Sequence, residues 1–393
     1  MLDKVLDLVQ KHEAYRSSCV NLIASENVVS DQVKRALGSD LAGRYVAYPK
    51  FYGGTRFMDE AWSLTEERAC RVFRAKYASV NPIGGHIALM ATLTTLCRPG
   101  ATVASIPPEY GGYGGLAREH SMASMLGLRA DYLPYDGEGY NLNTEKSLEY
   151  IAQNKPKVVV LGSSVILFPQ PVREVAEEVH RYGGSLVYDG SHVMGLIAGG
   201  VFQDPLREGA DVLVGSTHKS FFGPQGGLIL SNDSEFMAKL SSNFLHVTQD
   251  NPHPNRVAAL GVALAEAEKW GAQYASRVVL NSKRLAKLLF EEGLPVTPNT
   301  RGDFTQSHQV FLNYGGWEKG SDVRDKLEEV RIIVDAGVRV GLNEVTRRGY
   351  DEVDIESLAH AIALKLKGHE ANTDILKIVD ELVEKHPRIH YTL

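Results

Sequence analysis

The sequence predicts an α/β fold in which a large domain with a mostly parallel sheet is followed by a smaller α+β C-terminal domain. Three observations lead to this prediction. Short apolar runs alternate with stretches of helical periodicity along most of the chain. Two of these runs end in a charged residue, as strands do at the ligand-binding edge of an open parallel sheet. The chain has 393 residues, which is more than one hydrophobic core usually serves.

Periodicity places the elements along the chain. Apolar residues at helical spacing predict helices over 2–14, 60–77, 87–96, 172–182, 234–243, 256–270, 276–293 and 321–330, with two more after residue 351. Short apolar runs predict strands at 101–107, 157–162, 186–189, 211–219, 227–231, 294–296, 309–312, 332–334 and 338–341. We expect an N-terminal helical arm (residues 1–20), a large domain (21–271) and a small C-terminal domain (272–393).

The composition is that of a globular protein that handles small molecules. Hydrophobic residues make up 44% and charged residues 23% of the chain. The formal net charge of -6 provides no basic surface for nucleic acid and no polybasic patch for a membrane. The sequence shows neither a signal peptide nor an apolar run that would span a bilayer. We therefore expect a cytoplasmic protein with a small-molecule substrate and with no nucleic acid or membrane partner.

The cysteines and histidines do not indicate a metal site. Cys19, Cys70 and Cys97 show no paired spacing, which is more typical of buried small residues than of disulfides or metal ligands. Two histidines and an aspartate lie between residues 246 and 253, but without tight ligand spacing. We expect no metal.

Two apolar runs end in groups of opposite charge. Leu186-Val187-Tyr188 leads to Asp189, and the run that begins at Asp211 leads through Ser216 to Lys219. The carboxyl ends of neighbouring parallel strands meet at one edge of a sheet, where ligands of such folds bind. Asp189 and Lys219 are therefore expected to share a pocket.

A lysine and a carboxylate in one pocket suit pyridoxal 5'-phosphate (PLP). The lysine forms a Schiff base with the aldehyde, and the carboxylate pairs with the pyridinium nitrogen so that the ring accepts electrons. A glycine-rich segment, residues 220–227, follows the lysine. The alternative is that Asp189 caps a helix and Lys219 is a surface residue, but the ordered pair between two apolar runs favours the cofactor.

The segment Ile83-Gly84-Gly85-His86 precedes a predicted helix. A turn of small residues at a helix N-terminus presents backbone N–H groups to an anion, so we expect Gly85 and His86 to bind the phosphate of PLP. As a plain turn the segment would need no ligand.

Several motifs together resemble the serine hydroxymethyltransferase family, which are fold-type I (aspartate aminotransferase-like) PLP enzymes. The motifs occur in the family's order and cover most of the chain: Leu22-Ile23-Ala24-Ser25-Glu26-Asn27, Tyr188-Asp189-Gly190-Ser191-His192, Ser216-Thr217-His218-Lys219, Gly223-Pro224-Gln225-Gly226-Gly227, Gly337-Val338-Arg339-Val340-Gly341 and Thr346-Arg347-Arg348-Gly349.

The resemblance implies a role for each matching residue. The expected catalytic residues are Lys219, Tyr45, Tyr52 and His192. The expected cofactor-binding residues are Gly85, His86, Tyr113, Ser164, Asp189, His192, Thr217, His218 and Lys219. The expected substrate-binding residues are Ser25, Tyr45, Tyr52 and Arg339, with Arg339 on the α-carboxylate. Taken alone, Ser25 could equally cap the helical stretch 28–37, and Tyr113 could be a loop aromatic without a catalytic contact.

The sequence also departs from the family pattern. Ala47 stands where the family has the glutamate associated with folate-dependent one-carbon transfer, and Tyr113 stands where it has a histidine stacked on the cofactor ring. Only five residues separate Ile333 from Arg339, where the family has a longer loop near the pteridine. The stretch 244–255 lacks the glycines that reach the neighbouring subunit's phosphate, for which Thr248, Gln249 or Asn251 are candidate replacements.

These departures favour a folate-independent member of the family. We expect it to act on a β-substituted α-amino acid through an external aldimine and a quinonoid, as a carbon–sulfur or β-eliminating lyase, an aldolase or transaldolase, or a decarboxylating enzyme, such as relatives in natural-product pathways. The alternative is a true hydroxymethyltransferase that uses a tetrahydrofolate-type carrier. The family builds each active site from two chains, so the resemblance also implies a homodimer.

Overall fold

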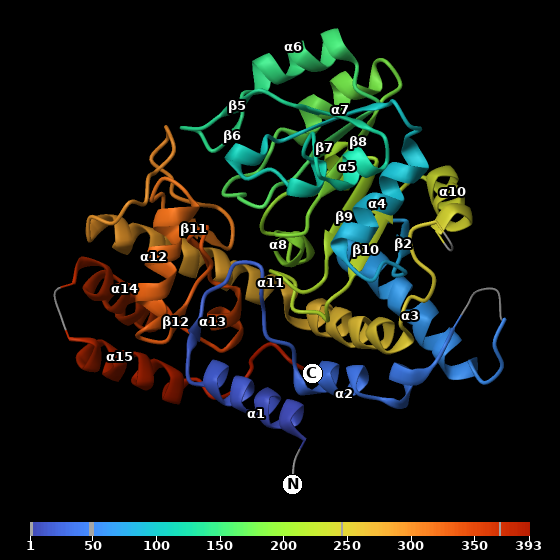
Figure 1. Ribbon diagram of the computed structural model, residues 1–393. Helices are drawn as coiled ribbons and strands as arrows, with labels where there is room; N and C mark the ends of the chain where they lie inside the picture. The colour runs from blue at the N-terminus through green and yellow to red at the C-terminus, as the bar shows by residue number, and fades with distance from the viewer. Residues whose placement is uncertain (1–2, 47–50, 245–246, 369–370) are drawn as a thin grey trace. The chain divides into compact units, whose positions relative to one another are not determined.

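The computed structural model describes residues 3–46, 51–244, 247–368 and 371–393. The chain forms two compact units, both drawn in Figure 1. The first, here called the large unit, contains residues 29–275 and 391–393. The second, the small unit, contains residues 1–28 and 276–390.

The large unit is built on a seven-stranded sheet with the order β2-β10-β9-β8-β7-β3-β4. Its strands are β2 (Tyr77–Ser79), β3 (Thr102–Ser105), β4 (Arg129–Tyr132), β7 (Val158–Leu161), β8 (Ser185–Asp189), β9 (Val212–Ser216) and β10 (Gly227–Ser231). Strands β4, β3, β7, β8 and β9 pair in parallel, and β10 lies antiparallel between β9 and β2. A short hairpin of β5 (Tyr135–Asp136) and β6 (Asn141–Leu142) forms a separate pair. The predicted mostly parallel sheet is confirmed.

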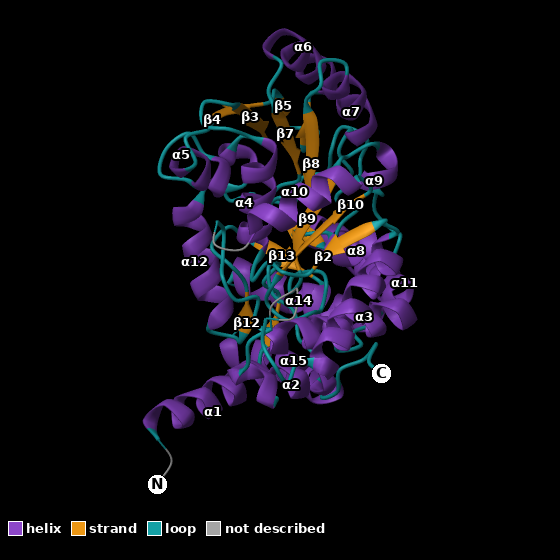
Figure 2. Cartoon of the chain, turned by 90° about the vertical axis from the view of Figure 1, so that its right-hand side faces the viewer, coloured by secondary structure: helices purple, strands orange, loops and turns teal. Residues whose placement is uncertain are grey.

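Helices cover both faces of this sheet (Figure 2). In the large unit they are α2 (Asp31–Leu37), α3 (Arg56–Phe73), α4 (Gly85–Leu96), α5 (Met122–Met125), α6 (Thr144–Asn154), α7 (Val172–His180), α8 (Met194–Ala198), α9 (Pro205–Glu208), α10 (Ser234–Phe244) and the first part of α11 (Pro254–Glu291). Val187, Val212 and Val214 share a core with residues of α4, α5 and α10. The side chain of Leu213 points to the opposite face of the sheet from those of its neighbours Val212 and Val214. It lies beside Gly190, near α8.

Three strands of the sheet are buried along their whole length, and β8 is buried except at its two end residues. Every residue of β7, β9 and β10 is buried. Parallel strands that are covered on both faces are apolar on both sides, so their sequences read as continuous apolar runs without alternation. This is why short apolar runs, which end at Asp189 and before Lys219, were sufficient to predict them.

Helix α11 runs unbroken from Pro254 to Glu291. The prediction of two separate helices, 256–270 and 276–293, was wrong. Gly271 lies inside the helix and gives room for a close approach of Gly199, where an added Cβ would come within 2.6 Å of the Gly271 carbonyl oxygen. A glycine inside a helix costs only about 1 kcal/mol relative to alanine, which a helix of 38 residues tolerates.

The small unit contains two pairs of short strands. Strand β1 (Val20–Asn21) is parallel to β12 (Ile332–Ile333), and β11 (Gln309–Phe311) is antiparallel to β13 (Arg339–Gly341). Its helices are α1 (Lys4–Ser17), α12 (Trp317–Glu328), α13 (Asn343–Arg347), α14 (Glu352–Lys367), α15 (Asn372–Lys385) and the end of α11. The predicted strand at 294–296 is a turn, because the Leu294 N–H bonds back to the Leu289 carbonyl at 3.0 Å and Pro295 has no N–H to pair.

Residues 21–28, which the sequence analysis assigned to the large domain, group with the small unit. Strand β1 pairs with β12, and the Leu22 carbonyl accepts a hydrogen bond from the Gly341 N–H at 2.7 Å. These contacts join segments that are distant in sequence, so local patterns did not indicate them.

Two further observations concern the described residues as a set. No helix among them is both long enough and apolar enough to cross a membrane. They contain no group of three or more histidine, cysteine, aspartate or glutamate side chains placed to hold a metal ion. Cys19 and Cys97 are buried free thiols, and Cys70 is a partly buried one.

Glu66 on α3 is an unusual carboxyl for a helix that covers the sheet. It is partly buried, and it accepts hydrogen bonds from the Trp62 side chain and the Val80 backbone. Burial raises the pKa of Glu66 to about 7, although both hydrogen bonds oppose the shift. The folded chain therefore favours the protonated form of this carboxyl.

Replacing Glu66 by glutamine should alter how stability depends on pH. A carboxyl whose pKa is raised on folding destabilises the folded state increasingly as pH rises from the unfolded pKa of about 4.5 to the folded pKa of about 7. Glutamine stays neutral. The melting temperature of Glu66→Gln minus that of the wild type should therefore increase as the pH rises from about 5 to about 8. Differential scanning calorimetry at several pH values measures this difference.

Glu67→Gln is the matched control, because Glu67 is the exposed neighbour on the same helix. The difference in melting temperature between Glu67→Gln and the wild type should stay constant over the same pH range. A difference that also stays constant for Glu66→Gln would contradict the raised pKa of Glu66.

Candidate active site

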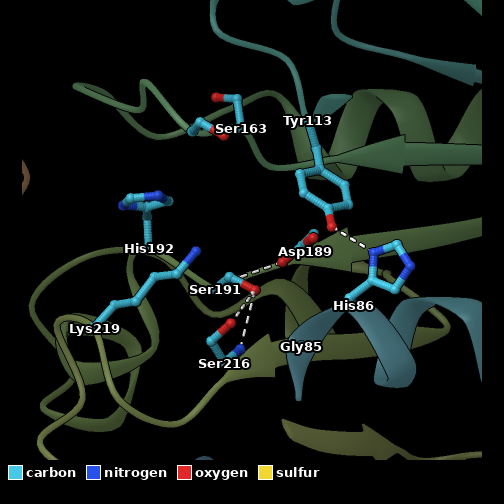
Figure 3. A pocket seen from close by; sticks show the side chains of 10 residues that line it. Gly85, His86, Tyr113, Ser163, Asp189, Ser191, His192, Ser216 and Lys219 are labelled. Carbon is cyan, nitrogen blue, oxygen red and sulfur yellow. Dashed lines mark hydrogen bonds between the residues drawn. The ribbon is translucent and has the colours of Figure 1, made fainter. Parts of the chain in front are cut away.

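A pocket lies where β7, β8 and β9 end at the same edge of the sheet. The residues that line it are Gly85, His86, Tyr113, Ser163, Ser164, Asp189, Ser191, His192, Ser216 and Lys219. The space they surround measures about 380 Å³, including its solvent-open mouth. Figure 3 shows the side chains of Lys219, Asp189 and Tyr113 directed toward this space. The prediction that Asp189 and Lys219 share a pocket is confirmed.

Hydrogen bonds of Ser191 link the ends of β8 and β9. Asp189 Oδ1 accepts a hydrogen bond from the Ser191 N–H at 3.0 Å. Ser191 Oγ in turn accepts one from the Ser216 N–H at 3.0 Å. At the end of β7, Gly162 has a φ of 94° and lies so close that an added Cβ would be 2.0 Å from the Asp189 carbonyl oxygen. Asp189 is thereby held in a fixed position on its strand.

Lys219 lies in a loop that Thr217 closes. The Thr217 N–H donates to the Gly226 carbonyl at 3.0 Å, and its hydroxyl donates to the Pro224 carbonyl at 2.6 Å. The Thr217 carbonyl accepts from the Gly223 N–H at 2.8 Å. Thr217 was expected to contact the cofactor, but it does not line the pocket. In the structure it fixes the loop that carries the lysine.

His218 was also expected to contact the cofactor and does not line the pocket either. Desolvation, assisted by the neighbouring positive charge of Lys219, lowers the pKa of His218 to about 4. Its imidazole is therefore neutral at physiological pH. A neutral neighbour adds no second positive charge beside the lysine.

The turn that opens α4 forms the opposite wall. Gly85 is buried, and an added Cβ would lie 2.3 Å from Ser216 Oγ and 3.1 Å from the Ser216 backbone nitrogen, so a larger residue would require Ser216 to move. Helix α4 has twelve residues, and its first N–H groups are free of intrahelical partners. Together they make an anion-binding site that suits a phosphate group.

His86 and Tyr113 form a hydrogen-bonded pair at the pocket. His86 Nδ1 lies 2.6 Å from the Tyr113 hydroxyl oxygen. Burial raises the pKa of the Tyr113 phenol, and the charge of Asp189 adds to this effect. The phenol therefore keeps its proton at physiological pH. Tyr113, which stands where the family has a histidine, thus contacts a residue in the first turn of α4.

His192 and Ser164 complete the predicted pocket residues. His192 is 4% exposed and lies at the start of the segment that leads to α8. The Ser164 N–H donates to the Gly111 carbonyl at 2.7 Å, which joins the end of β7 to the loop before Tyr113. Sequence reasoning did not assign Ser163, Ser191 or Ser216. Their positions directly after a strand, or at its last residue, were the available signal.

Tyr45 and Tyr52 do not reach this pocket within the chain. They line a separate cavity of about 940 Å³, including its solvent-open mouth, with ring centroids 5.5 Å apart. Tyr45 is 52% and Tyr52 38% exposed. Ala47, which stands at the family's glutamate position, lies outside the described residues.

The two remaining substrate-binding candidates belong to the small unit. Arg339 begins β13, and its Nη2 pairs with Asp335 Oδ2 at 2.9 Å. Ser25 is partly buried and follows Ile23, which bridges to Val340 of the same strand. The two candidates therefore lie on adjoining segments of the small unit.

The candidate replacements for the glycine loop have contacts within their own chain. Gln249 Oε1 accepts from the Ile83 N–H at 3.0 Å, and its Nε2 donates to the Asn81 carbonyl at 2.8 Å. Thr248 donates to the Phe244 carbonyl, and Asn251 accepts from the His253 N–H. Gln249 thus supports the turn before α4.

The pocket fits PLP. Lys219 provides the amine for a Schiff base, Asp189 the carboxylate for the ring nitrogen, and the glycine turn at α4 the site for the phosphate. Tyr113 provides an aromatic face beside them. These groups come from four different segments that the fold brings together.

Comparisons with known proteins point to the same chemistry. The family model for serine hydroxymethyltransferase matches residues 1–362. The serine hydroxymethyltransferase of Methanothermobacter thermautotrophicus is 37% identical over 407 residues, which cover 99% of this chain and 95% of that protein. That of Pyrobaculum aerophilum is 37% identical over 400 residues, which cover 96% of this chain and 92% of that protein.

A solved structure is similar over nearly the whole chain. L-threonine transaldolase from Pseudomonas fluorescens, in its internal aldimine state, matches with a TM-score of 0.91 at 28% identity, covering 99% of this chain and 92% of that one. The expected fold type and the expected PLP dependence are confirmed. The chain belongs to the serine hydroxymethyltransferase family of fold-type I, PLP-dependent enzymes.

Proposed function

We propose that this enzyme cleaves the Cα–Cβ bond of a β-hydroxy-α-amino acid, such as threonine, without a folate carrier. The observation that carries the proposal is the acid–base content of the pocket. Among the residues that line it, the only carboxylate is Asp189, which the cofactor's ring nitrogen would engage. Among the described residues no second carboxylate lines this pocket, and Ala47 stands in the sequence where the family has the glutamate of folate-dependent carrier chemistry. Similarity to L-threonine transaldolase supports the choice of substrate class.

The reaction divides between two proton-transfer sites. PLP, when bound, supplies an electron sink for the pair that remains on Cα. A base removes the β-hydroxyl proton, the Cα–Cβ bond breaks and an aldehyde leaves. Cα then takes up a proton, which yields glycine, or it adds a second aldehyde, which yields a new β-hydroxy amino acid. Each route balances without an oxidant or a carrier.

The pocket offers one residue for each site. Lys219 is proposed to deliver the proton to Cα, since it is the amine released when the substrate replaces it. His192 is proposed as the base for the β-hydroxyl, because its imidazole lines the pocket together with Lys219. Arg339 stays our proposal for the residue that binds the α-carboxylate.

A second candidate is hydroxymethyl transfer between serine and a tetrahydrofolate-type carrier. The relatives from Methanothermobacter thermautotrophicus and Pyrobaculum aerophilum, each 37% identical, are named serine hydroxymethyltransferase, which favours it. The identity is low enough for relatives to differ in acceptor, so the carrier has to be tested directly.

We also propose that the chain acts as a homodimer. Helix α1 has no buried residue, and its apolar side chains Val5, Leu6, Leu8 and Val9 are between 48% and 66% exposed. Tyr45 and Tyr52 add exposed aromatic surface. Burying such surface against a second copy would be favourable.

Tetrahydrofolate should leave the cleavage rate unchanged. The PLP-loaded enzyme is incubated with L-threonine or L-serine, with and without the carrier, and released aldehyde and glycine are quantified. We expect equal rates with L-threonine in both conditions. Serine cleavage that requires the carrier would instead establish the second candidate. Lys219→Ala is the inactive control.

His192→Asn should separate the two proton transfers. Asparagine cannot accept the β-hydroxyl proton, so kcat for aldehyde release should fall by about 10²–10⁴. Exchange of the glycine Cα proton with deuterated water, followed by NMR, should stay near the wild-type rate because it depends on Lys219. An equal loss in both assays would refute a base role for His192.

Charges placed on α1 should weaken the dimer. The wild type should have twice the chain mass of 43.1 kDa by light scattering, and the double variant Val5→Glu, Val9→Glu should shift toward the monomer because carboxylates resist burial. His12→Glu, on the same helix at an exposed polar position, is the control. A double variant that dimerises as well as the wild type would exclude α1 from the interface.

A further inference from the structure

Arg256 is a buried cation at the start of α11. It is 5% exposed, and its Nη2 donates to the carbonyls of Val80 at 2.6 Å, Pro252 at 2.9 Å and Asn81 at 3.2 Å. Among the described residues, no acidic side chain pairs with it, and its Nη1 has no hydrogen-bond partner. Burial lowers the pKa of Arg256 to about 10, so it remains charged at physiological pH.

The carbonyls that Arg256 binds lead directly into the phosphate turn. Val80 and Asn81 precede the segment 82–85, from which α4 begins. Gln249 holds the same segment through Ile83 and Asn81. On its other side, the Gly227 N–H donates to the Pro82 carbonyl at 2.9 Å. Arg256 is thus one of three supports for this turn.

The guanidinium also lies against the loop that carries the lysine. A Cβ added to Gly226 would be 2.8 Å from Arg256 Nη1. A Cβ added to Gly227 would be 2.3 Å from the Gly84 carbonyl oxygen. Only glycines permit this close packing of loop, turn and arginine. The positive charge is therefore fixed directly behind the turn, outside the pocket lining.

A buried charge without a counter-ion is costly, so its presence calls for a compensating anion. The α4 turn is the adjacent place where an anion can bind, since its N–H groups face the pocket. A phosphate monoester would bring up to two negative charges there. Its attraction to Arg256 acts through protein of low dielectric constant, where charges interact more strongly than in water.

We propose that Arg256 is a positioning residue for the phosphate group of the cofactor. It orients the 80–85 segment by binding its carbonyls, and it provides an uncompensated positive charge behind the N–H groups that receive the phosphate. The proposal deepens the PLP assignment and rests on it. It predicts that Arg256 distinguishes PLP from pyridoxal, which has the same ring and aldehyde but no phosphate.

The test compares the affinities of the apoprotein for PLP and pyridoxal. Both are titrated by fluorescence quenching into the wild type, Arg256→Met and Arg256→Lys. We expect Arg256→Met to weaken PLP binding by about tenfold, because the buried charge attracts the phosphate without contacting it. Pyridoxal binding should change much less. Arg256→Lys keeps the charge and should lie between the wild type and Arg256→Met.

Arg68→Met is the matched control, because Arg68 also binds α11, at the Gly261 carbonyl, and pairs with Glu268. It should leave both affinities unchanged. Circular dichroism checks that each variant folds. If Arg256→Met does not fold, Arg256→Gln decides, because glutamine keeps an amide donor for the carbonyls and loses the charge. A ratio of PLP to pyridoxal affinity equal to that of the wild type would then overturn the proposal.

Two other outcomes would also overturn it, and they differ from a failure of the cofactor assignment. Equal weakening for both ligands would mean that Arg256 only supports the fold. Unchanged PLP affinity in Arg256→Met would mean that the charge is irrelevant to the phosphate. A wild type that binds neither ligand would instead remove the PLP assignment itself.

Discussion

The parallel pairing of β7, β8 and β9 determines where the reactive groups of this enzyme lie. Asp189 pairs in register with Val214, so the carboxylate at the end of β8 and the loop after β9 emerge at one edge. The Ser191 bridge and the tight contact at Gly162 hold that edge together. Asp189 and Lys219 are separated by thirty positions in sequence, yet the sheet places them in one pocket.

The groups around this edge of the sheet differ in charge because their surroundings differ in burial and in neighbouring charges. Lys219 has the neutral His218 beside it, because burial lowers that histidine's pKa to about 4. Tyr113 keeps its phenolic proton, since burial and Asp189 both raise its pKa. The cationic Arg256 lies behind the turn of α4. Negative charge is thus favoured at the turn, while Asp189 presents a single carboxylate at the strand end.

The sequence predicted the parts of the site that depend on local pattern. Asp189 and Lys219 follow apolar runs, and Gly85 follows a turn, so neighbouring residues were informative. Tyr45 and Tyr52 were assigned by resemblance, and in the structure they line a separate cavity. Arg256 was missed because its partners at Val80 and Asn81 are 176 and 175 positions away. The domain boundary expected after residue 271 divided α11 in two, whereas the helix continues from one unit into the other.

The most direct test of the central claim is to locate the lysine that carries the cofactor. Borohydride reduction of the PLP-loaded enzyme converts the Schiff base into a stable secondary amine, and peptide mass spectrometry then identifies the modified residue. The structure predicts a single pyridoxyl adduct on Lys219, which is lost in Lys219→Ala. An adduct on another lysine, or none at all, would contradict the assignment of this pocket as the active site.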